Sequence, residues 1–486
     1  MLVNHDGEVV GSHQLEHHQH FPHPGWVEHD PLEIWNRSCK VITEALNHVN
    51  HEKGQLAAIG VTNQRESTVV WDPSTGKPLL NAIVWQDTRT SDMIGDLSEK
   101  HGIDNFREIT GLPLATYFSG TKLRWILENI EGARIAAKAG RAMFGTIDSW
   151  LVWNLTGGSS GGAHVTDVTN ASRTMLMNIE TLSWDEGMLD LFGVPSSMLP
   201  EIKPSISAEP YGHTRVDGPL GERIPVCSIL GDQHAALFGQ TCFDAGTSKN
   251  TYGTGCFLLM NTGEKIVHSS SGLLTTVAYQ RMDNPPVYAL EGSVAVAGAL
   301  VQWLRDKLGL IERSADIEIL ASQTADSAGV YFVPAFSGLF APYWRTDARG
   351  IIAGLTGYAG APHIARAVLE STAFQTWEIV EAMEKDSGYT IDNLKVDGGM
   401  VGNDILMQFQ ADILNMPIVR PQIAETTALG AAYAAGLASG FWETTSELES
   451  HWEKDREWRP KMEKNERQHR LKFWKKAVQR TFDWVD

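Results

Sequence analysis

The chain has 486 residues, a length that favours two or three domains over a single core. Hydrophobic residues make up 42% and charged residues 20% of the sequence, and the formal net charge of −19 argues against nonspecific binding to nucleic acid or to an anionic membrane. Four cysteines without Cys-x-x-Cys spacing predict neither a disulfide framework nor a zinc site. Because no apolar run approaches the roughly 20 residues of a membrane span and no signal peptide is recognisable, we expect a cytoplasmic protein.

Apolar, strand-like runs alternate with amphipathic helical stretches along the chain, which indicates an α/β protein. Buried strands are expected at residues 56–61, 82–85 and 394–396, and helices are expected to begin at Leu123 and Ile405. The composition changes most clearly near residues 235–250. We therefore predict an N-terminal lobe of residues 1–240 and a C-terminal lobe of residues 241–486.

Two short segments that contain glycine carry the strongest chemical signal. Asp232 and Gln233 follow Gly231, and a Gly-Thr-Gly turn at residues 253–255 comes soon after. Glycines let backbone N–H groups approach an anion closely, and a threonine hydroxyl adds a neutral donor. A carboxylate beside them can accept the proton of an attacking alcohol. The pattern predicts phosphoryl transfer to a hydroxyl, and its alternative interpretation is two ordinary turns of an α/β protein.

The common nucleotide-binding motifs are missing. Gly76-Lys77 is followed by Pro78 rather than by serine or threonine, and no Gly-x-Gly-x-x-Gly follows an expected strand. These absences argue against a P-loop or a Rossmann domain. Separate glycine turns far apart in the sequence suit an actin-like ATPase, in which phosphate loops come from both lobes.

Longer motifs extend this interpretation over the whole chain. They lie at residues 25–31, 62–67, 81–85, 117–122, 167–174, 231–257 and 397–400. In these segments the chain resembles the glycerol kinases of the FGGY family of carbohydrate kinases, and residues 333–344 resemble the animal type. The resemblance implies a two-lobed, actin-like (ribonuclease H-like) α/β fold with the active site in the cleft between the lobes. The N-terminal lobe would bind glycerol and the C-terminal lobe the nucleotide.

The resemblance also implies roles for individual residues, with Asp232 as the catalytic base. The residues matching the family's glycerol site are Arg65, Glu66, Trp85, Tyr117, Asp232, Gln233 and Phe257. Those matching its ATP site are Gly253, Thr254, Gly255, Gly298, Gln302, Gly399 and Asn403. Mg²⁺ is expected to bridge phosphate oxygens and to reach Asp232 through water.

The implied reaction is the ATP-dependent phosphorylation of glycerol to sn-glycerol 3-phosphate, the first step of glycerol catabolism. The implied assembly is a homo-oligomer, either a dimer or a tetramer.

One family motif is missing from the start of the chain. Family members begin with a strand that runs into an Asp-x-Gly-Thr phosphate loop, and no Asp-x-Gly-Thr occurs in the first 60 residues here. We therefore expect a truncated first lobe and poor folding or slow turnover, because a preorganised phosphate clamp supplies much of such a rate. Two alternatives stay open: a non-catalytic protein that binds glycerol or nucleotide, and another FGGY sugar kinase, such as one for xylulose or a heptulose.

Overall fold

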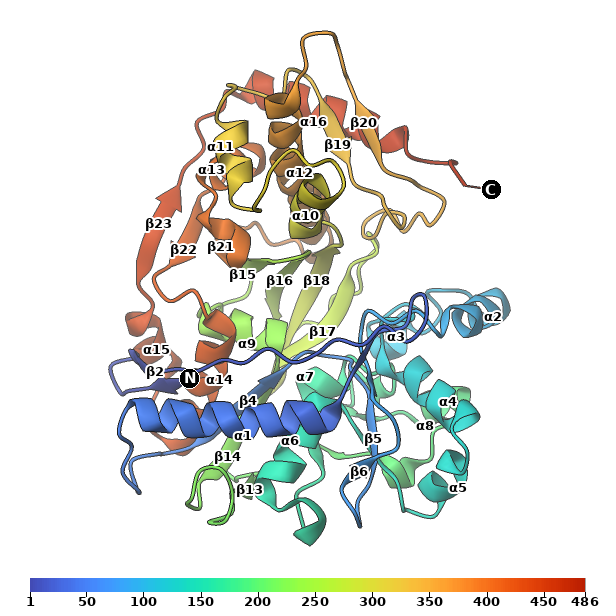
Figure 1. Ribbon diagram of the computed structural model, residues 1–486, viewed down its shortest axis with the longest axis vertical. Coiled ribbons are helices and arrows are strands. Elements are labelled where there is room, and N and C mark those ends of the chain that lie inside the picture. The colour runs from blue at the N-terminus through green and yellow to red at the C-terminus, as the bar shows by residue number, and fades with distance from the viewer. Residues whose placement is uncertain (486) are drawn as a thin grey trace.

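The computed structural model describes residues 1–485 as two bodies, which lie one above the other in Figure 1. The strands are β1 Leu2–Val3, β2 Val9–Gly11, β3 Glu28–His29, β4 Ile59–Asn63, β5 Val69–Asp72, β6 Lys77–Pro78, β7 Ala82–Ile83, β8 Met143–Gly145, β9 Val165–Asp167, β10 Met177–Asn178, β11 Ser183–Trp184, β12 Glu201–Lys203, β13 Gly212–His213, β14 Pro225–Gly231, β15 Ser248–Tyr252, β16 Cys256–Gly263, β17 Leu274–Tyr279, β18 Val287–Val294, β19 Tyr331–Val333, β20 Ile351–Ala353, β21 Leu394–Asp397, β22 Ile418–Pro421 and β23 Lys454–Trp458.

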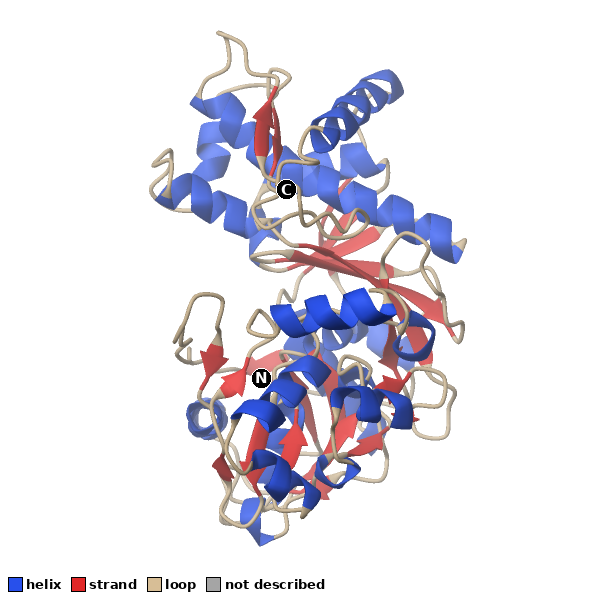
Figure 2. Cartoon of the chain, turned by 90° about the vertical axis from the view of Figure 1, so that its right-hand side faces the viewer, coloured by secondary structure: helices blue, strands red, loops and turns tan. Residues whose placement is uncertain are grey.

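Helices cover the sheets of both bodies, as Figure 2 shows from the side. The α-helices are α1 Pro31–His48, α2 Ser91–His101, α3 Arg107–Thr110, α4 Ser119–Asn129, α5 Ala133–Lys138, α6 Ile147–Thr156, α7 Val168–Ala171, α8 Glu186–Phe192, α9 Asp232–Gly239, α10 Gly298–Asp306, α11 Asp316–Ala321, α12 Ala361–Ser387, α13 Asp404–Leu414, α14 Thr426–Ser439, α15 Thr445–His451 and α16 Lys464–Gln479. Short 3₁₀ helices span Gly158–Ser160, Ser196–Met198 and Gly399–Gly402.

The lower body is organised around the parallel strands β4 and β14. Their register pairs Val61 with Ile229 and Asn63 with Gly231, so the two strands end at the same edge. Parallel strands that end together place the residues that follow them side by side. The register therefore brings Arg65 and Asp232 to one place, although they are far apart in the sequence.

Helix α14 returns from late in the chain to pack against α9 of the lower body. A Cβ atom at Gly430 would lie only 1.8 Å from the carbonyl oxygen of Ala235, and one at Gly239 would lie 2.0 Å from that of Thr426. Real Cβ contacts are never this short, so the two helices approach closely only because both positions are glycine. This packing holds α9, which carries Asp232, against its neighbours.

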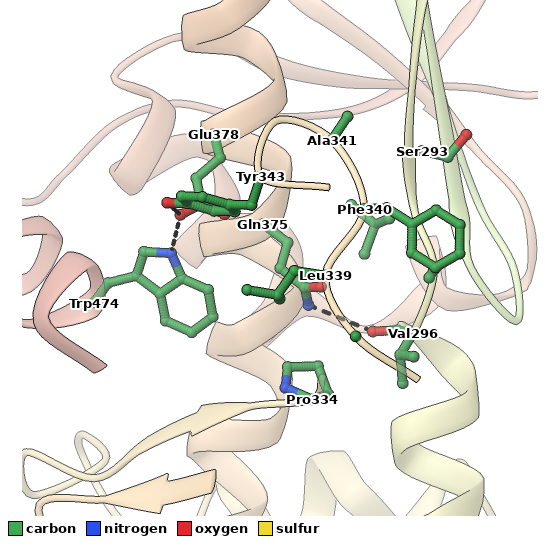
Figure 3. Close-up of a pocket in the computed structure, with 13 residues that line it drawn as sticks. Ser293, Val296, Pro334, Leu339, Phe340, Ala341, Tyr343, Gln375, Glu378 and Trp474 are labelled. Atoms are coloured by element: carbon green, nitrogen blue, oxygen red, sulfur yellow. Dashed lines mark hydrogen bonds between the residues drawn. The ribbon is translucent and has the colours of Figure 1, made fainter. Parts of the chain in front are cut away.

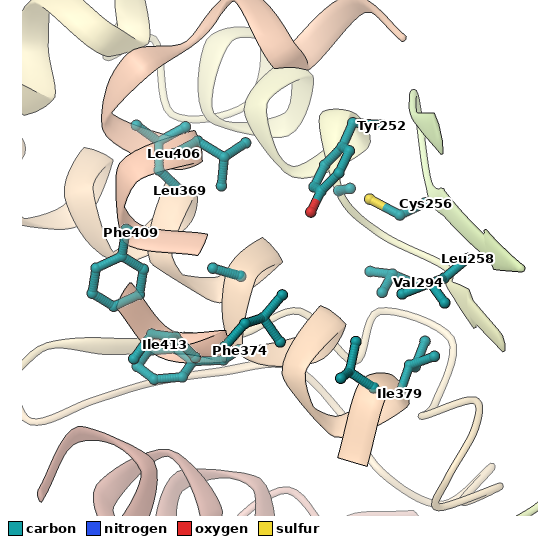
Figure 4. Packing of buried hydrophobic residues seen from close by; sticks show 14 of the residues in the cluster. Tyr252, Cys256, Leu258, Val294, Leu369, Phe374, Ile379, Leu406, Phe409 and Ile413 are labelled. Carbon is teal, nitrogen blue, oxygen red and sulfur yellow. The ribbon is translucent and has the colours of Figure 1, made fainter. Parts of the chain in front are cut away.

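The upper body contains a mixed sheet in the order β17-β18-β16-β15-β21-β22-β23. Strand β21 is parallel to β15 and to β22, and the other neighbouring pairs are antiparallel. Figure 4 shows the apolar face of this sheet packed against α12 and α13. Helix α16 completes the core, where the buried Trp474 ring stacks on Phe374 with centroids 5.0 Å apart.

A carboxylic acid is buried in this upper core. Glu378 of α12 accepts hydrogen bonds from the Tyr343 hydroxyl at 2.6 Å and from the Trp474 indole N–H at 2.8 Å, the latter drawn in Figure 3. Burial raises the pKa of Glu378 to about 7, against the opposing effect of these two donors. Beside it lies a cavity of about 20 Å³, which is enough for one water molecule. The acid thus connects α12, α16 and the loop that carries Tyr343.

A larger pocket, partly open to solvent, lies in the lower body beside β4. Its volume is about 440 Å³, and α1, α14, β4 and residues 1–3 line it. Within residues 1–485, β1 pairs with β2 and not with β4, which forms the edge of its own sheet. The side chains around the pocket are mainly apolar, including Ile42, Val61 and Ala435.

Three expected elements differ from the structure by two or more residues at an end, and β21 and α13 each differ by one. The strand expected at residues 56–61 is Ile59–Asn63, because its limits follow the backbone ladder with β14 rather than the apolar run. The strand expected at residues 82–85 stops at Ile83, since Val84 bonds to Val27 outside the ladder. Helix α4 begins at Ser119, four residues before Leu123. Within residues 1–485, no helix combines the length and the apolar character that crossing a membrane requires.

Candidate active site

The predicted glycerol-site residues Arg65 and Asp232 meet where β4 and β14 end. The guanidinium Nε of Arg65 lies 3.1 Å from Oδ1 of Asp232, and the Asp232 side chain keeps 33% of its surface exposed. Oδ1 of Asp232 also accepts a hydrogen bond from the backbone N–H of Gln233 at 2.7 Å. The carboxylate is therefore fixed at the start of α9 yet open to a ligand.

Arg65 belongs to a buried cluster of four charged groups that joins the two bodies. Arg65 donates two hydrogen bonds to Glu291 of β18, at 2.5 and 3.0 Å. Arg173, which follows α7, donates to Glu66 at 2.7 Å and to the same Glu291 at 3.1 Å. All four side chains are at most 2% exposed. The cluster fixes the positions of Arg65 and Glu66 from both sides.

The electrostatics of this cluster are set by burial and by its own cations. Burial alone would raise the pKa of Glu291, but Arg173 and Arg65 outweigh that effect and lower it to about 2. Burial raises the pKa of Glu66, and the same two guanidinium groups oppose the rise. Two cations thus balance two carboxylates in a dry site, where removing one partner of such a set costs about 3–5 kcal/mol.

Glu66 also has an unusual backbone. Its φ of +58° lies in the left-handed region that residues with a side chain rarely adopt. The Ser119 hydroxyl donates to the Glu66 carbonyl at 3.0 Å, and the Thr68 hydroxyl donates to it at 3.1 Å. Such strain costs about 1–3 kcal/mol and is concentrated at functional sites. The Glu66 carboxylate accepts from Arg173, so this strained turn lies directly beside the ion cluster.

Three aromatic rings lie together beside the charged cluster. Trp85 meets Tyr117 edge-on with centroids 5.4 Å apart and meets Phe257 edge-on at 6.1 Å. Arg173 lies over the Tyr117 ring at 5.7 Å, which connects the aromatic group with the ion cluster. Burial raises the pKa of the Tyr117 hydroxyl, so it stays a neutral donor. The structure thus brings all seven predicted glycerol-site residues to one region.

The predicted phosphate turn follows β15 and touches the start of α10. The backbone N–H of Gly298 donates to the Gly253 carbonyl at 3.0 Å, and that of Ala299 donates to the Thr254 carbonyl at 3.0 Å. A Cβ atom at Gly298 would lie 2.6 Å from the Gly253 oxygen, and one at Gly255 would lie 2.5 Å from the backbone oxygen of Val294. Glycine is therefore required at both positions. Thr254 itself is exposed, as a residue that meets a ligand must be.

The remaining predicted nucleotide residues lie on three elements: Gly399 in the turn after β21, Asn403 at the start of α13 and Gln302 on α10. Gly398 has a φ of +91°, and a Cβ atom there would lie 2.5 Å from the Tyr252 carbonyl oxygen, so this turn rests on the end of β15. Gly399 follows it and is exposed. Asn403 caps α13 through its side-chain oxygen, which accepts from the N–H of Leu406 at 2.8 Å. Gln302 is exposed on α10.

The donor set suits a metal carried by phosphates better than one held by the protein. Within residues 1–485 no group of three or more His, Cys, Asp or Glu side chains is placed to hold an ion. Mg²⁺ needs few protein ligands when phosphate oxygens and water supply the rest. The exposed part of the Asp232 carboxylate fits that role.

Comparison with known proteins decides the family. Residues 1–239 match the N-terminal domain model of the FGGY family of carbohydrate kinases, and residues 248–439 match its C-terminal domain model. The chain belongs to the FGGY family of carbohydrate kinases. The actin-like two-lobed fold expected from the motifs is thereby confirmed.

Similar proteins within this FGGY family are named glycerol kinases. The chain is 59% identical to the glycerol kinase of Renibacterium salmoninarum over all of its own length and 96% of the relative's, and 60% identical to that of Chloroflexus aurantiacus over 97% of the relative. It is 41% identical to the crystal structure of Plasmodium falciparum glycerol kinase with ADP, with a TM-score of 0.92 over 99% of this chain and 95% of that one. The two relatives named first are bacterial, so the likeness of residues 333–344 to the animal type stays a prediction.

The expected truncation of the first FGGY lobe is not borne out. The N-terminal family model matches from residue 1, and the relatives are covered over 96–97% of their length. The lobe is also folded around β4 and β14, with α1, α6 and α14 packed in it. The missing Asp-x-Gly-Thr sequence was too narrow a basis for that expectation, because one short motif does not decide whether a sheet and its covering helices form.

Sequence reasoning missed two members of the ion cluster, Arg173 and Glu291. Arg173 lies inside a matched motif, at residues 167–174, but was given no role. Glu291 had a visible signal, because it is the one charged residue of the otherwise apolar strand β18. A carboxylate in such a strand requires a buried partner.

Proposed function

We propose that this FGGY kinase transfers the γ-phosphoryl group of ATP to a terminal hydroxyl of glycerol, giving sn-glycerol 3-phosphate and ADP. One observation carries the proposal: Arg65 and Asp232 meet at 3.1 Å beside the aromatic rings. Relatives named glycerol kinase at 59–60% identity support the choice of substrate.

The polar and the aromatic residues of the site are proposed to contact different parts of glycerol. Arg65, Glu66 and Tyr117 offer donors and acceptors for the hydroxyl groups of a small polyol, and Trp85 and Phe257 form walls for its carbon face. This arrangement is compact and rigid, because the ion cluster behind it is fully buried. Larger sugars would need room that the edge-on aromatic rings occupy.

Asp232 is proposed as the general base. Its carboxylate is fixed by Arg65 and by the N–H of Gln233, and it keeps one-third of its surface open. From there it can accept the proton of the attacking hydroxyl as the new P–O bond forms. Positioning of the two substrates supplies most of the rate in such a transfer.

The nucleotide is proposed to lie against the 253–255 turn, the start of α10 and the turn that contains Gly399. Backbone N–H groups in these turns suit phosphate oxygens. Gln302 and Asn403 would contact the nucleoside part, Asn403 through the amide nitrogen that its capping bond leaves free. Bound Mg²⁺ would neutralise part of the phosphate charge, and Asp232 would reach it through water.

The proposal extends to the division of the lobes, the location of the protein and its assembly. The family-model matches support a division of the lobes near residues 240 and 241. All four cysteines are free thiols, which supports a reducing, cytoplasmic location. The homo-oligomer, dimer or tetramer, is proposed from the family resemblance.

The deciding experiment is glycerol-dependent release of ADP from MgATP by the purified chain. Asp232→Asn should lower kcat by about 10²–10⁴-fold while the protein remains folded. Asp217→Asn is the matched control and should leave the rate unchanged, because Asp217 lies in an exposed turn and pairs only with the surface residue Arg215. Equal rates for the two variants would refute the assignment of the base. Faster turnover of xylulose than of glycerol would favour the other sugar kinases, and glycerol binding without ADP release would indicate the non-catalytic alternative.

A further inference from the structure

Lys249 is a buried lysine in the middle of β15, and no role has been assigned to it. Its side chain is fully buried, and its ammonium donates hydrogen bonds to the side-chain oxygen of Gln233, to the Thr251 hydroxyl at 2.9 Å and to the Phe257 carbonyl at 3.4 Å. All three acceptors are neutral. Within residues 1–485, no carboxylate lies within ion-pair distance of this ammonium.

A buried cation with only neutral partners is energetically unusual. Taking an ammonium out of water costs several kcal/mol, which a nearby carboxylate normally offsets. Burial accordingly lowers the pKa of Lys249 to about 8, although the more distant carboxylates of Asp397 and Asp232 act in the opposite direction. The two neighbouring guanidinium groups are already paired with carboxylates, Arg65 with Asp232 and Glu291 and Arg173 with Glu66 and Glu291. Among the described residues, Lys249 is thus a buried positive charge that no carboxylate neutralises by direct contact.

The contacts of Lys249 place that charge between the base and the phosphate turn. Gln233 is the neighbour of Asp232 at the start of α9, and Phe257 is one of the aromatic walls. Thr251 pairs with Phe257 in the β15–β16 ladder and precedes the turn at Gly253 by two residues. An anion held by that turn and attacked by a hydroxyl at Asp232 would approach the Lys249 ammonium.

The bond to Gln233 has a second effect. A lysine ammonium has donors only, so the atom of Gln233 that faces it must be the carboxamide oxygen. The amide NH₂ group of Gln233 is then turned away from Lys249 and is free to donate. The lysine thus decides that Gln233 offers a donor, rather than an acceptor, to a ligand.

We propose that Lys249 is a positioning residue for phosphoryl transfer, which orients the Gln233 carboxamide and supplies the positive charge toward which the phosphoryl group moves. The inference rests on the proposed kinase function. It predicts an effect on the chemical step more than on glycerol binding, because the charge acts where negative charge accumulates during transfer.

The test compares Lys249→Met, Lys249→Arg and the control Lys395→Met in steady-state assays with glycerol and MgATP. Lys395 is the register partner of Lys249 on β21, but its ammonium contacts the end of α9 at Gln240 and Thr241 instead. Lys249→Met should lower kcat about 100-fold or more and change KM for glycerol by less than about threefold. Lys249→Arg restores the charge on a larger, planar group, so its kcat should be higher than that of Lys249→Met. Lys395→Met should keep kcat within about threefold of the parent.

A double-mutant cycle with Gln233→Ala adds a readout that a purely structural role would not move. If Lys249 acts partly through Gln233, the activation free energy lost in the double variant will be clearly smaller than the sum of the losses in the two single variants. If Lys249→Met does not fold, Lys249→Gln takes its place in the cycle, because it keeps a donor to Gln233 while losing the charge. A parent chain that does not phosphorylate glycerol would refute the proposed function itself. An active parent with equal kcat for Lys249→Met and Lys395→Met would overturn this inference alone.

Discussion

Replacing the buried Glu378 by glutamine should change how the stability of the upper body depends on pH. Glutamine keeps the shape of the side chain and an acceptor for Trp474 and Tyr343, but it does not titrate. The pKa of Glu378 is about 7 in the folded protein, against an ordinary value of 4.5. At about 1.4 kcal/mol per pKa unit, the difference amounts to about 3 kcal/mol.

The direction of the change in stability with pH follows from the linkage between folding and proton binding. A carboxyl group whose pKa is raised by folding contributes fully to stability below its unfolded pKa, and that contribution is lost as the pH rises through the folded value. The free energy of unfolding of the parent should therefore fall between pH 4.5 and pH 8 by up to about 3 kcal/mol more than that of Glu378→Gln. The difference in stability should therefore shift toward the variant as the pH rises to 8.

The assay is urea unfolding at several pH values between 5 and 8, followed by the fluorescence of Trp474 and the other tryptophans. Other buried acids, such as Asp148 with its pKa of about 7, titrate in both proteins and cancel in the difference. Glu381→Gln is the matched control, because Glu381 lies one helical turn further along α12 with 56% of its side chain exposed. A parent-minus-variant difference that stays constant across this pH range would refute the reasoning.

Three further substitutions test the packing of the site and of the helices around it. Arg173→Met leaves two buried carboxylates short of a cation and should lower the free energy of unfolding by about 3–5 kcal/mol in denaturant titration; a loss below 1 kcal/mol would contradict the buried cluster. Gly255→Ala places a methyl group 2.5 Å from the Val294 carbonyl oxygen. It should raise KM for ATP or lower kcat at least about tenfold. Unchanged ATP kinetics would argue against a role of this turn in phosphate binding. Gly430→Ala forces α14 away from α9 and should cost about 2 kcal/mol or more by thermal unfolding, whereas Gly95→Ala, in the open middle of α2, should gain up to about 1 kcal/mol.

The sequence was most informative where function depends on short motifs after strands. The pairs Arg65–Glu66 and Asp232–Gln233 were recognisable because each follows an apolar run, and parallel strands bring such positions together. Their family resemblance also predicted the two-lobed fold. The roles assigned to these residues stay predictions until variants are measured.

Contacts between distant side chains could not be predicted in the same way. Arg65 and Glu291 are 226 positions apart, and neither periodicity nor spacing links them. Lys249 stands next to a recognised motif, yet its burial depends on how β15, β16 and α9 pack. Strand limits were inexact for a related reason, since the ladder that defines Ile59–Asn63 pairs backbones and ignores whether Thr62 is apolar.

The pocket of about 440 Å³ beside β4 makes hydrostatic pressure an informative variable for this protein. High pressure favours the entry of water into space that apolar side chains fill incompletely, and in the lower body the pocket beside β4 is such a space. We expect the signals of the lower body to change at lower pressure than those of the tightly packed upper core. Since β4 leads directly to Arg65, the proposed glycerol-binding residues should lose their arrangement at lower pressure than the proposed nucleotide-binding turns.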